Sequence, residues 1–452
     1  MSNETLQVAQ FCSQLRYSDL PGQVVERTKE LVLDLLGNAI AGHEMESSRL
    51  VTGLVRSMGG TEEATVIGEG LKVPVANAVL ANGSMAHGVE MGDTHRWTYL
   101  HPGAAVIPTA LAIAEKHHLS GDELLVAVVA GYEVGIRLAY AVNPSHRRRG
   151  FHTTATVGAV AATAAASRAM SLGLEETANA LGIGGTQAAG LVEFLAQGAM
   201  IERFHPGRSA QSGIYAALLA SAGFTGPETI LEGPHGFCRA MSDEPDLGWL
   251  NRGLGEEFRI LEVGTKPYAS CRFCNSSIDA AREIVAETGP LPPDMVAEIV
   301  VTVSPLCSSQ TGNQEPKSFI AAQLSTPYSV ALTISGKGAG LSGYMAGLGD
   351  KAVMATAKKV LLVADPSFGE DSRHVSMEVR LADGRRLCST VDLPLGEPER
   401  PMTRDALLEK FMELATTAID RYAAERIAIE IDGIERVRSL DGLLSLLGQP
   451  IQ

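Results

Sequence analysis

The chain has 452 residues, 45% of them hydrophobic and 20% charged, which predicts a globular protein too large for a single hydrophobic core. Its formal net charge of -15 argues against a general nucleic-acid binder, which needs a basic face to neutralise phosphates. The opening segment MSNETLQVAQ lacks the basic and apolar pattern of a signal peptide, and six cysteines give no disulfide framework. These features predict a cytoplasmic protein with no membrane or nucleic-acid partner.

The N-terminal part of the chain, to about residue 250, has the spacing of apolar residues that is typical of helices. Residues 22–42 repeat apolar side chains at helical intervals. Residues 154–171 carry no charge before Arg168, and a helix without a polar face is typical of one buried among other helices. A similar helix is expected at 209–222.

The pattern changes after about residue 265. Residues 298–304 are β-branched and alternate, which predicts a strand. Residues 374–393 contain two alternating runs separated by Asp383-Gly384, which predicts a β-hairpin. Helices are expected at 275–287 and 318–334.

Helical character returns near the C-terminus. Thr403 is the predicted N-cap of a helix that runs to about Tyr422, and further helical turns are expected to about residue 447. The predicted fold is therefore mainly α, with a smaller α+β domain. We place the helical domain at 1–264, completed by the C-terminal helices at 403–452, and the α+β domain at 265–402.

Three segments carry polar residues that packing alone does not require. The first, residues 86–103, is a glycine-rich loop that ends in His-Pro-Gly, and loops on rigid scaffolds are where catalytic groups concentrate. A solvated connection with incidental histidines is the alternative. The ionisable and hydroxyl side chains of interest in this loop are His87, Glu90, Asp93, Thr94, His95, Arg96 and His101.

The other two segments each place a histidine beside a predicted buried helix. His152 directly precedes the apolar helix, and the positive end of the helix dipole favours a neutral imidazole that can act as a base. His205 and Arg208 flank a Pro-Gly turn that is expected to open the next helix, so its backbone N–H groups could hold a carboxylate. A simple helix start capped by Ser209 is the alternative.

Residues 265–275 combine cysteines with cations. One Cys271-x-x-Cys274 pair is weak evidence for a metal or redox site, because no second pair accompanies it, and packing is the favoured interpretation. Lys266 and Arg272 are more informative, because a substrate with several carboxylates needs fixed cations.

The sequence predicts no cofactor and no metal. The glycines at 182–185 follow a helical run rather than a strand, and the stretch 335–340 lacks the Gly-Lys-Ser/Thr ending of a phosphate-binding loop. An enzyme built on this chain would therefore work with its side chains alone.

Several of these segments, in the same order, resemble the MmgE/PrpD family, which includes 2-methylcitrate dehydratase, cis-aconitate decarboxylase and iminodisuccinate epimerase. The resemblance implies a large helical domain with a smaller α+β lid, a homodimer, and an active site between the domains. The segments that carry it are LVLDLLGNAIAGH (31–43), NGSMAHGVEMGDT and HPG (82–103), GFHTTATVGAVAATAAAS (150–167), FHPGRSAQSGIYAALLA (204–220), KPYASCRFCNSSIDA (266–280) and QLSTPYSVAL (323–332).

The resemblance also implies site residues. Matching positions are His101, His152, Thr94, Lys266 and Tyr328.

Three positions depart from the family pattern. A family aspartate is Glu90 here, a usual lysine is Glu202, and a usual histidine is Asn275. Glutamate in place of lysine replaces a carboxylate-binding cation by an anion. A substrate with fewer carboxylates, or one that bears an amine or hydroxyl group at that end, would suit Glu202 better than a tricarboxylate.

The leading hypothesis is a cofactor-independent lyase of the dehydratase type that acts on a small anionic di- or tricarboxylic acid. His101 or His152 would remove the proton α to a carboxylate, and the other histidine or Tyr328 would protonate the departing β-hydroxyl. Lys266, with Arg208 or Arg272, would hold the carboxylate and stabilise the charge that develops.

Three alternatives remain from the sequence. An epimerase or isomerase, or a decarboxylase, would use the same carbanion with a different outcome. A third possibility is an inactive relative that is retained for binding or assembly.

Overall fold

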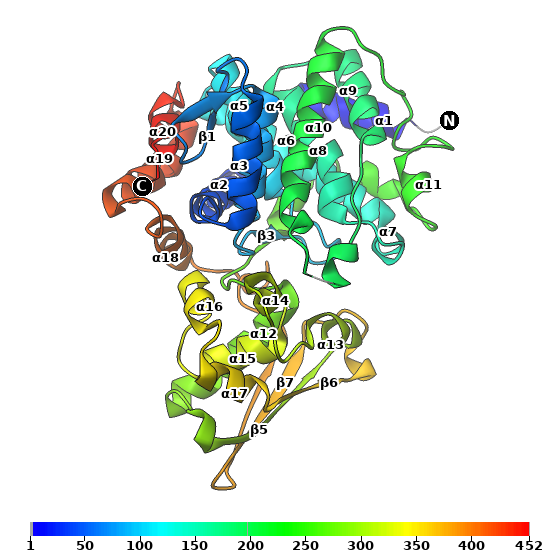
Figure 1. Ribbon diagram of the computed structural model, residues 1–452. Coiled ribbons are helices and arrows are strands. Elements are labelled where there is room, and N and C mark those ends of the chain that lie inside the picture. The colour runs from blue at the N-terminus through cyan, green and yellow to red at the C-terminus, as the bar shows by residue number, and fades with distance from the viewer. Residues whose placement is uncertain (1–2, 197, 452) are drawn as a thin grey trace. The chain divides into compact units, whose positions relative to one another are not determined.

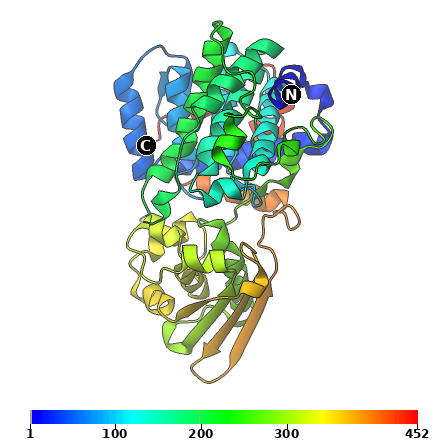
Figure 2. The same ribbon diagram turned by 90° about the vertical axis from the view of Figure 1, so that its right-hand side faces the viewer.

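The structure is a computed structural model that describes residues 3–196 and 198–451. The chain forms two compact units. The first consists of Met1–Phe194, Met200–Gly264 and Arg404–Gln452, and the second of Leu195–Ala199 and Thr265–Thr403. The first unit is helical and the second combines helices with a sheet (Figures 1 and 2). The predicted fold class, mainly α with a smaller α+β part, is confirmed.

The first unit is a bundle of helices with a two-stranded antiparallel hairpin, β1 (Ala64–Val66) and β2 (Leu71–Val73). Its helices are α1 (Glu4–Gln14), α2 (Gly22–Gly42), α3 (Glu46–Met58), α4 (Val75–Ala86), α5 (Gly103–His117), α6 (Gly121–Val142), α7 (Ser145–Arg148), α8 (Thr153–Ala169), α9 (Leu174–Thr186), α10 (Ile201–Ser221), α11 (Phe237–Met241), α18 (Arg404–Ala415), α19 (Arg421–Asp432) and α20 (Asp441–Leu447).

Helices α8 and α10 form the centre of this unit and pack side by side (Figure 1). Every residue of α8 except Arg168 is buried, so the prediction of a helix without a polar face at 154–171 is confirmed. The chain can bury such a helix because alanine and glycine let neighbouring backbones approach closely. The helix predicted at 22–42 is also confirmed, as α2.

Helices α4 and α10 cross at two glycines. A Cβ atom added to Gly83 would lie 2.7 Å from the Cα atom of Gly207, and one added to Gly207 would lie 2.2 Å from the carbonyl oxygen of Leu80. No side chain fits at either position without moving backbone. The glycine pair therefore sets how closely α4 and α10 approach each other.

The start of α10 differs from the sequence prediction. The helix begins at Ile201 rather than near residue 209, and it includes Pro206 and Gly207. Pro206 is the sixth residue of the helix, where its missing N–H costs one intrahelical bond, and the packing of α10 against α4, α8 and α9 offsets this cost. The predicted Pro-Gly turn was therefore wrong, and so was the carboxylate-binding helix start that we expected beside it.

Helix α6 is long and apolar enough, by length and composition, to cross a membrane. Within the first unit, however, 94% of its apolar stretch is buried among other side chains. This burial is typical of a core helix in a folded domain.

The second unit is built on a four-stranded sheet in the order β6-β5-β7-β8. Strand β5 runs parallel to β6 and antiparallel to β7, which pairs antiparallel with β8. Its elements are α12 (Arg272–Thr288), β5 (Val296–Val303), α13 (Pro305–Thr311), α14 (Phe319–Gln323), α15 (Thr326–Ile334), α16 (Leu341–Gly347), α17 (Lys351–Ala357), β6 (Val360–Ala364), β7 (Val375–Leu381) and β8 (Arg386–Val391).

One face of this sheet packs against helices α12 and α15 (Figure 2). Alternate residues of β7, from Val375 to Leu381, are buried in the core that these helices share with the sheet. The predicted strand and hairpin are confirmed, and Gly384 in the turn has a φ of 90°, a conformation that glycine adopts without strain.

Two predicted helices are each interrupted. The helix predicted at 318–334 is two helices, because Ser325 caps α15 and Pro327 lies in its first turn. The C-terminal helix ends at Ala415 rather than near Tyr422, and Asp420 caps the separate helix α19 by accepting from the Ala423 N–H. In both cases a capping side chain restarts the helix.

Candidate active site

The loop between α4 and α5 presents His101 in a defined tautomer. The Nδ1 atom of His101 lies 2.7 Å from the backbone carbonyl oxygen of Asp93 and 3.1 Å from Oγ1 of Thr94. A carbonyl oxygen only accepts hydrogen bonds, so Nδ1 carries the proton and the neutral ring has its lone pair on Nε2. This arrangement makes Nε2 the nitrogen that can take a proton from a substrate.

The carboxylate of Asp93 holds this loop against the start of α5. Its oxygens accept hydrogen bonds from the Gly103 N–H at 3.1 and 3.2 Å and from the Tyr132 hydroxyl at 2.8 Å. Burial raises the pKa of the Asp93 carboxyl to about 6, and the hydrogen bonds from Tyr132 and Gly103 oppose that rise. Asp93, predicted as a substrate-binding residue, thus positions the backbone that carries His101.

Gly103 is required by this contact. A Cβ atom at this position would lie 2.6 Å from the Tyr132 hydroxyl and 2.9 Å from Oδ1 of Asp93. The glycine of the His-Pro-Gly motif therefore allows the carboxylate to reach the first turn of α5.

His152 and His205 are in direct contact. His152 is the N-cap residue of α8, as expected, and His205 lies on α10. Their Nδ1 atoms are 2.8 Å apart, and both side chains are more than 90% buried. Burial holds the pKa of His152 well below its usual value and lowers that of His205 to about 4. Both rings are therefore neutral at pH 7, and burial, rather than the helix dipole that the sequence suggested, is the main cause.

His87 joins these residues into one group. Its ring centroid lies 5.1 Å from that of His101. His152 lies close enough to His87 and His101 that a positive charge on either ring would lower the pKa of His152. We call His87, His101, His152 and His205 the histidine cluster.

Two carboxylates and an arginine lie beside the histidine cluster. Arg203 forms a buried ion pair with Glu90, and its Nη1 atom lies 3.6 Å from Glu202. The carboxylate of Glu202 is also 4.0 Å from Nε2 of His87. Glu90 has a φ of 61°, which non-glycine residues adopt at a cost and which is common at functional sites.

This group includes atoms that could bind a metal ion. The donor atoms of His87, Glu90 and Glu202 lie within 4.8 Å of one another. Among residues 3–196 and 198–451, no other three His, Cys, Asp or Glu side chains bring their donor atoms this close together. Imidazole and carboxylate donors suit divalent transition metals. Arg203, however, already provides a fixed positive charge to both carboxylates and would compete with a metal for them.

Arg208 is not part of this group. Its side chain lies on the exposed side of α10, and its Nη1 donates to Oε1 of Gln211 at 3.2 Å. Ser209 is buried and donates to the carbonyl oxygen of Ala155 on α8 at 2.7 Å, so it joins the two helices rather than capping one.

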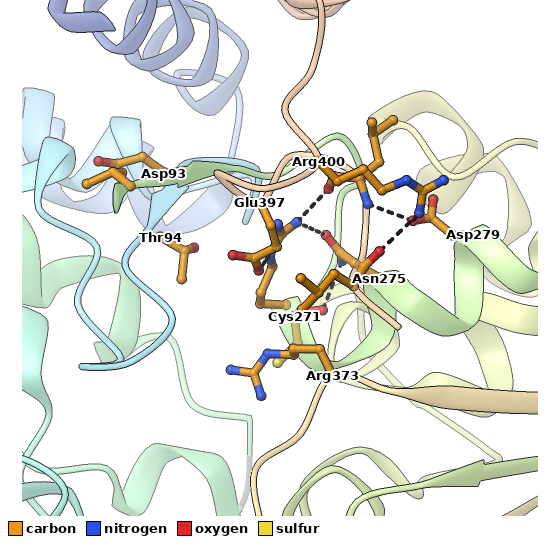
Figure 3. Close-up of polar contacts among 12 residues, drawn as sticks. Asp93, Thr94, Cys271, Asn275, Asp279, Arg373, Glu397 and Arg400 are labelled. Carbon is orange, nitrogen blue, oxygen red and sulfur yellow. Dashed lines mark hydrogen bonds and ion pairs between the residues drawn. The ribbon is translucent and has the colours of Figure 1, made fainter. Parts of the chain in front are cut away.

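In the second unit, Arg272 and Asn275 are bonded mainly to their own surroundings. Arg272 forms a buried ion pair with Glu397 at 2.9 Å and donates from Nη1 to Oδ1 of Asn275 at 2.9 Å. The amide of Asn275 donates in turn to Oγ of Ser270 at 3.0 Å. Figure 3 shows Asn275 and Glu397. One nitrogen of Arg272, the buried Nη2, has no hydrogen-bond partner among the described residues and remains able to donate to a ligand.

The segment that carries Glu397 is held by a second ion pair. Asp279 on α12 accepts from Nη1 of Arg400 at 3.0 Å and from the backbone N–H of Leu395 at 2.7 Å (Figure 3). Asp279 and Arg400 thus fix the chain on both sides of Glu397. We call Arg272, Asn275, Asp279, Glu397 and Arg400 the arginine network.

Lys266 and Tyr328 are both buried in the second unit. The Tyr328 hydroxyl donates to the backbone carbonyl oxygen of Tyr344 at 3.2 Å, and burial raises its pKa to about 12. Tyr328 therefore keeps its proton at neutral pH, and a role as general acid requires this hydrogen bond to break. The roles of Lys266 and Tyr328 in substrate binding and catalysis stay predictions.

The Cys271-x-x-Cys274 pair opens helix α12. Cys271 is the N-cap residue, and Cys274 is buried with its Sγ accepting from Oγ1 of Thr326 at 3.4 Å. Burial raises the pKa of the Cys274 thiol well above its usual value, so the thiol stays protonated and unreactive. These contacts agree with a packing role.

Three residues of the site were not predicted from the sequence as functional. His87 was noted only as part of a polar loop, and Arg203 stands directly after Glu202 without any motif to mark it. Tyr132 lies in the middle of an apolar helix. A tyrosine in such a helix needs a partner for its hydroxyl, and that signal could have identified Tyr132.

The fold and site together define a two-unit protein in which a helical domain holds a buried group of histidines and carboxylates. Family comparison gives the particular class: the MmgE/PrpD N-terminal domain matches residues 6–250 and the MmgE/PrpD C-terminal domain matches residues 268–436. The chain belongs to the MmgE/PrpD family.

Similar proteins align along almost the whole chain. A cis-aconitate decarboxylase of Aspergillus terreus is 27% identical over 100% of this chain and 97% of its own length. A human cis-aconitate decarboxylase is 26% identical over 96% of this chain and 92% of its own length.

Proposed function

We propose that this chain is a cofactor-independent lyase that acts on a small di- or tricarboxylic acid through a carbanion next to a carboxylate. The observation that carries the proposal is the histidine cluster, in which the Asp93 carbonyl fixes the proton of His101 on Nδ1. Membership of the MmgE/PrpD family and the similarity to cis-aconitate decarboxylases support an enzyme that processes carboxylic acids.

In this mechanism His101 and His152 exchange protons with the carbon next to the carboxylate. The lone pair on Nε2 of His101 can accept a proton, and the neutral ring of His152 can accept or donate one. A positioned histidine contributes about 10²–10⁴-fold to the rate of such a step.

The charge that develops on the substrate carboxylate requires a nearby cation. We assign this role to Lys266 and to the Nη2 group of Arg272, because fixed N–H donors stabilise developing negative charge. Arg208, predicted for the same role, is exposed and bonded to Gln211, which leaves Lys266 and Arg272 as the stronger candidates.

Two reactions share a carbanion next to a carboxylate. In dehydration, which is the outcome that the sequence predicts, proton abstraction forms the carbanion and the β-hydroxyl then leaves as water after protonation by the other histidine or Tyr328. In decarboxylation, the second candidate, breaking the C–CO₂ bond leaves the electron pair on carbon, and a protonated histidine then protonates that carbon. Decarboxylation is favoured by the cis-aconitate decarboxylase relatives that align along almost the whole chain.

Product analysis tests the proposal. The purified protein is incubated in D₂O with a panel of hydroxylated and unsaturated di- and tricarboxylic acids, and products are followed by NMR. Release of CO₂ indicates decarboxylation, an unsaturated acid without CO₂ indicates dehydration, and deuterium next to the carboxylate with neither indicates epimerisation.

A negative result would also be informative. Thermal stabilisation by an acid without any turnover or deuterium exchange would contradict an enzymatic function and support the inactive relative instead. Similar turnover in the wild type, His101→Ala and His152→Ala would contradict the roles given to the histidines.

A further inference from the structure

The contact between His152 and His205 restricts where protons can be. Two nitrogen atoms 2.8 Å apart form a hydrogen bond only when one carries a proton and the other offers a lone pair. For two neutral rings bonded through Nδ1, this leaves two arrangements. In the first, Nδ1 of His152 donates, so His152 has its lone pair on Nε2 and His205 has a proton on its own Nε2. In the second, Nδ1 of His205 donates, so His205 has its lone pair on Nε2 and His152 has a proton on its own Nε2.

The scaffold holds the two rings at this distance. The ring of Phe194 packs edge-on against both, with centroid distances of 5.1 Å to His152 and 5.9 Å to His205. The backbone N–H of His152 donates to the Gly190 carbonyl at 3.0 Å. The hydroxyl of Ser209 joins α10 to α8 one turn beyond. The pair is therefore built into the fold.

We propose that His205 is a proton-relay partner that allows His152 to act alternately as base and acid. This proposal rests on the proposed function, because it assigns a role to His205 in the same proton transfer. It changes the sequence prediction, in which His205 bound substrate.

The relay moves one proton through the pair. His152 accepts the substrate proton at Nε2 and passes its Nδ1 proton to Nδ1 of His205, which releases its own Nε2 proton to water. The bonds broken are the substrate C–H, the His152 Nδ1–H and the His205 Nε2–H. The bonds formed are His152 Nε2–H, His205 Nδ1–H and a bond to water. Both rings end neutral, and His152 can now donate a proton.

The surroundings of His152 disfavour a positive charge on its ring. Burial and the nearby His87, His101, His205 and Arg147 all lower the pKa of His152, so a lasting positive charge on that ring is costly. A relay avoids this cost because the charge on His152 is passed on as it forms.

The first test does not depend on activity. Nitrogen NMR of ¹⁵N-histidine-labelled wild-type protein reports the protonation of each ring nitrogen, and the His205→Asn variant identifies the signals of the pair. The relay predicts that both rings are neutral at pH 7, and that the Nδ1 signal of His152 changes when His205 is replaced. A charged ring at pH 7, or a His152 signal unaffected by the substitution, would overturn the relay.

The second test is kinetic. Asparagine at 205 places an amide where Nδ1 stood, so it can bond to His152 but cannot pass a proton on. We expect His205→Asn to lower kcat about 10–100-fold, less than the about 10²–10⁴-fold expected for a histidine that exchanges a proton with substrate directly, while KM changes less than about threefold. We also expect a plot of the wild-type kcat against the D₂O fraction of the solvent to be curved, because two exchangeable protons move in the relay. The same plot for His205→Asn should be a straight line.

The matched control is another buried histidine of the first unit. His146 bonds through Nε2 to Oγ1 of Thr156 at 2.8 Å, and glutamine can replace that bond. We expect His146→Gln to keep the curved D₂O dependence. A His205→Asn enzyme within about twofold of the wild-type kcat, or a linear wild-type dependence, would overturn the relay. If the wild type turns over no acid, the proposed function fails and the NMR result alone decides whether the pair shares a proton.

Discussion

The histidine cluster of the first unit and the arginine network of the second are both buried and polar, yet they differ in how their protons are held. In the arginine network the charges are fixed, since arginine stays protonated and Arg272 and Arg400 are ion-paired with Glu397 and Asp279. In the histidine cluster, the Nδ1 atoms of His152 and His205 lie 2.8 Å apart, and a hydrogen bond between these neutral rings leaves one proton between the two nitrogens.

This difference separates two uses of buried polarity. A network of opposite fixed charges holds the backbone in one arrangement. It offers a ligand only the donors that the network does not use, such as the Nη2 group of Arg272. The neutral imidazoles of His152 and His205 can each hold the shared proton on either of two nitrogens. The first should therefore be sensitive to substitution through stability and the second through rate.

The largest effect is expected from the loss of His101. We predict that His101→Ala lowers kcat about 10²–10⁴-fold, because the proton acceptor on Nε2 is lost. The urea midpoint of unfolding should change little, since His101 is only partly buried. Steady-state kinetics and urea unfolding on the same preparation measure both quantities. A large loss of stability with an unchanged kcat would show that the histidine cluster is structural.

The next effect is expected from the loss of Arg272. Breaking a buried ion pair by removing one partner costs about 3–5 kcal/mol, so Arg272→Met should lower the free energy of unfolding by that order. The control is Arg380→Met, which removes an exposed ion pair with Glu298 and should change the urea midpoint little. Equal midpoints for the two variants would contradict a structural role for the arginine network.

A smaller effect is expected from the loss of the Tyr132 hydroxyl. Tyr132→Phe removes a buried hydrogen bond to Asp93 and should cost about 1–3 kcal/mol. The pKa of Asp93 is raised, so its ionised form is the one that the fold disfavours, and stability falls as the pH rises through about 6. The hydroxyl opposes this loss by bonding the ionised form, so the gap between variant and wild type should widen above pH 6. Urea midpoints from pH 5 to 8 test this, and a gap independent of pH would contradict it.

The last effect concerns acid stability and is absent at neutral pH. The pKa of His152 is held below its value in the unfolded chain, and that of His146 is lowered to about 4, so the unfolded state binds protons first as the pH falls. Stability from these neutral histidines is therefore present above about pH 6.5 and is lost below it, by up to about 1.4 kcal/mol per group and pH unit.

This effect should appear in the first unit. Hydrogen exchange at pH 7 and pH 5 should show α8 and α10 losing protection before β5 and β7. His146→Gln should reduce the loss without affecting the second unit. Earlier loss of protection in β5 and β7 would contradict the assignment of acid sensitivity to the histidines.

Much of the fold follows from local patterns in the sequence. The buried helix α8 was predicted because it lacks a polar face, and the β7–β8 hairpin because Asp383-Gly384 separates two alternating runs. The start of α10 was mispredicted because Pro206 suggests a boundary, whereas the structure places it inside the helix. Local propensity was overridden there by the packing of α10 against α4, α8 and α9.

The sequence supplied candidate site residues but not the contacts between them. His101, His152 and His205 were chosen from the sequence, but their partners are set by contacts between segments far apart in the chain. The bond between His152 and His205 spans 53 residues, and that between Tyr132 and Asp93 spans 39. No local spacing encodes such distances. Conversely, Arg272 was predicted as a cation for a substrate carboxylate, and its ion pair with Glu397, 125 residues away, was not foreseen because Glu397 carries no motif.

The crossing of α4 and α10 has a consequence for engineering. Gly83 precedes His87 by one helical turn, and Gly207 follows His205 by two residues, so a Cβ atom at either glycine would push apart the helices next to these histidines. Variation of substrate range can proceed through side chains around the histidines, whereas random mutagenesis at 83 or 207 should return glycine in nearly every functional clone. In directed evolution these two positions are best excluded from the library, because any residue other than glycine there requires the α4 and α10 backbones to move.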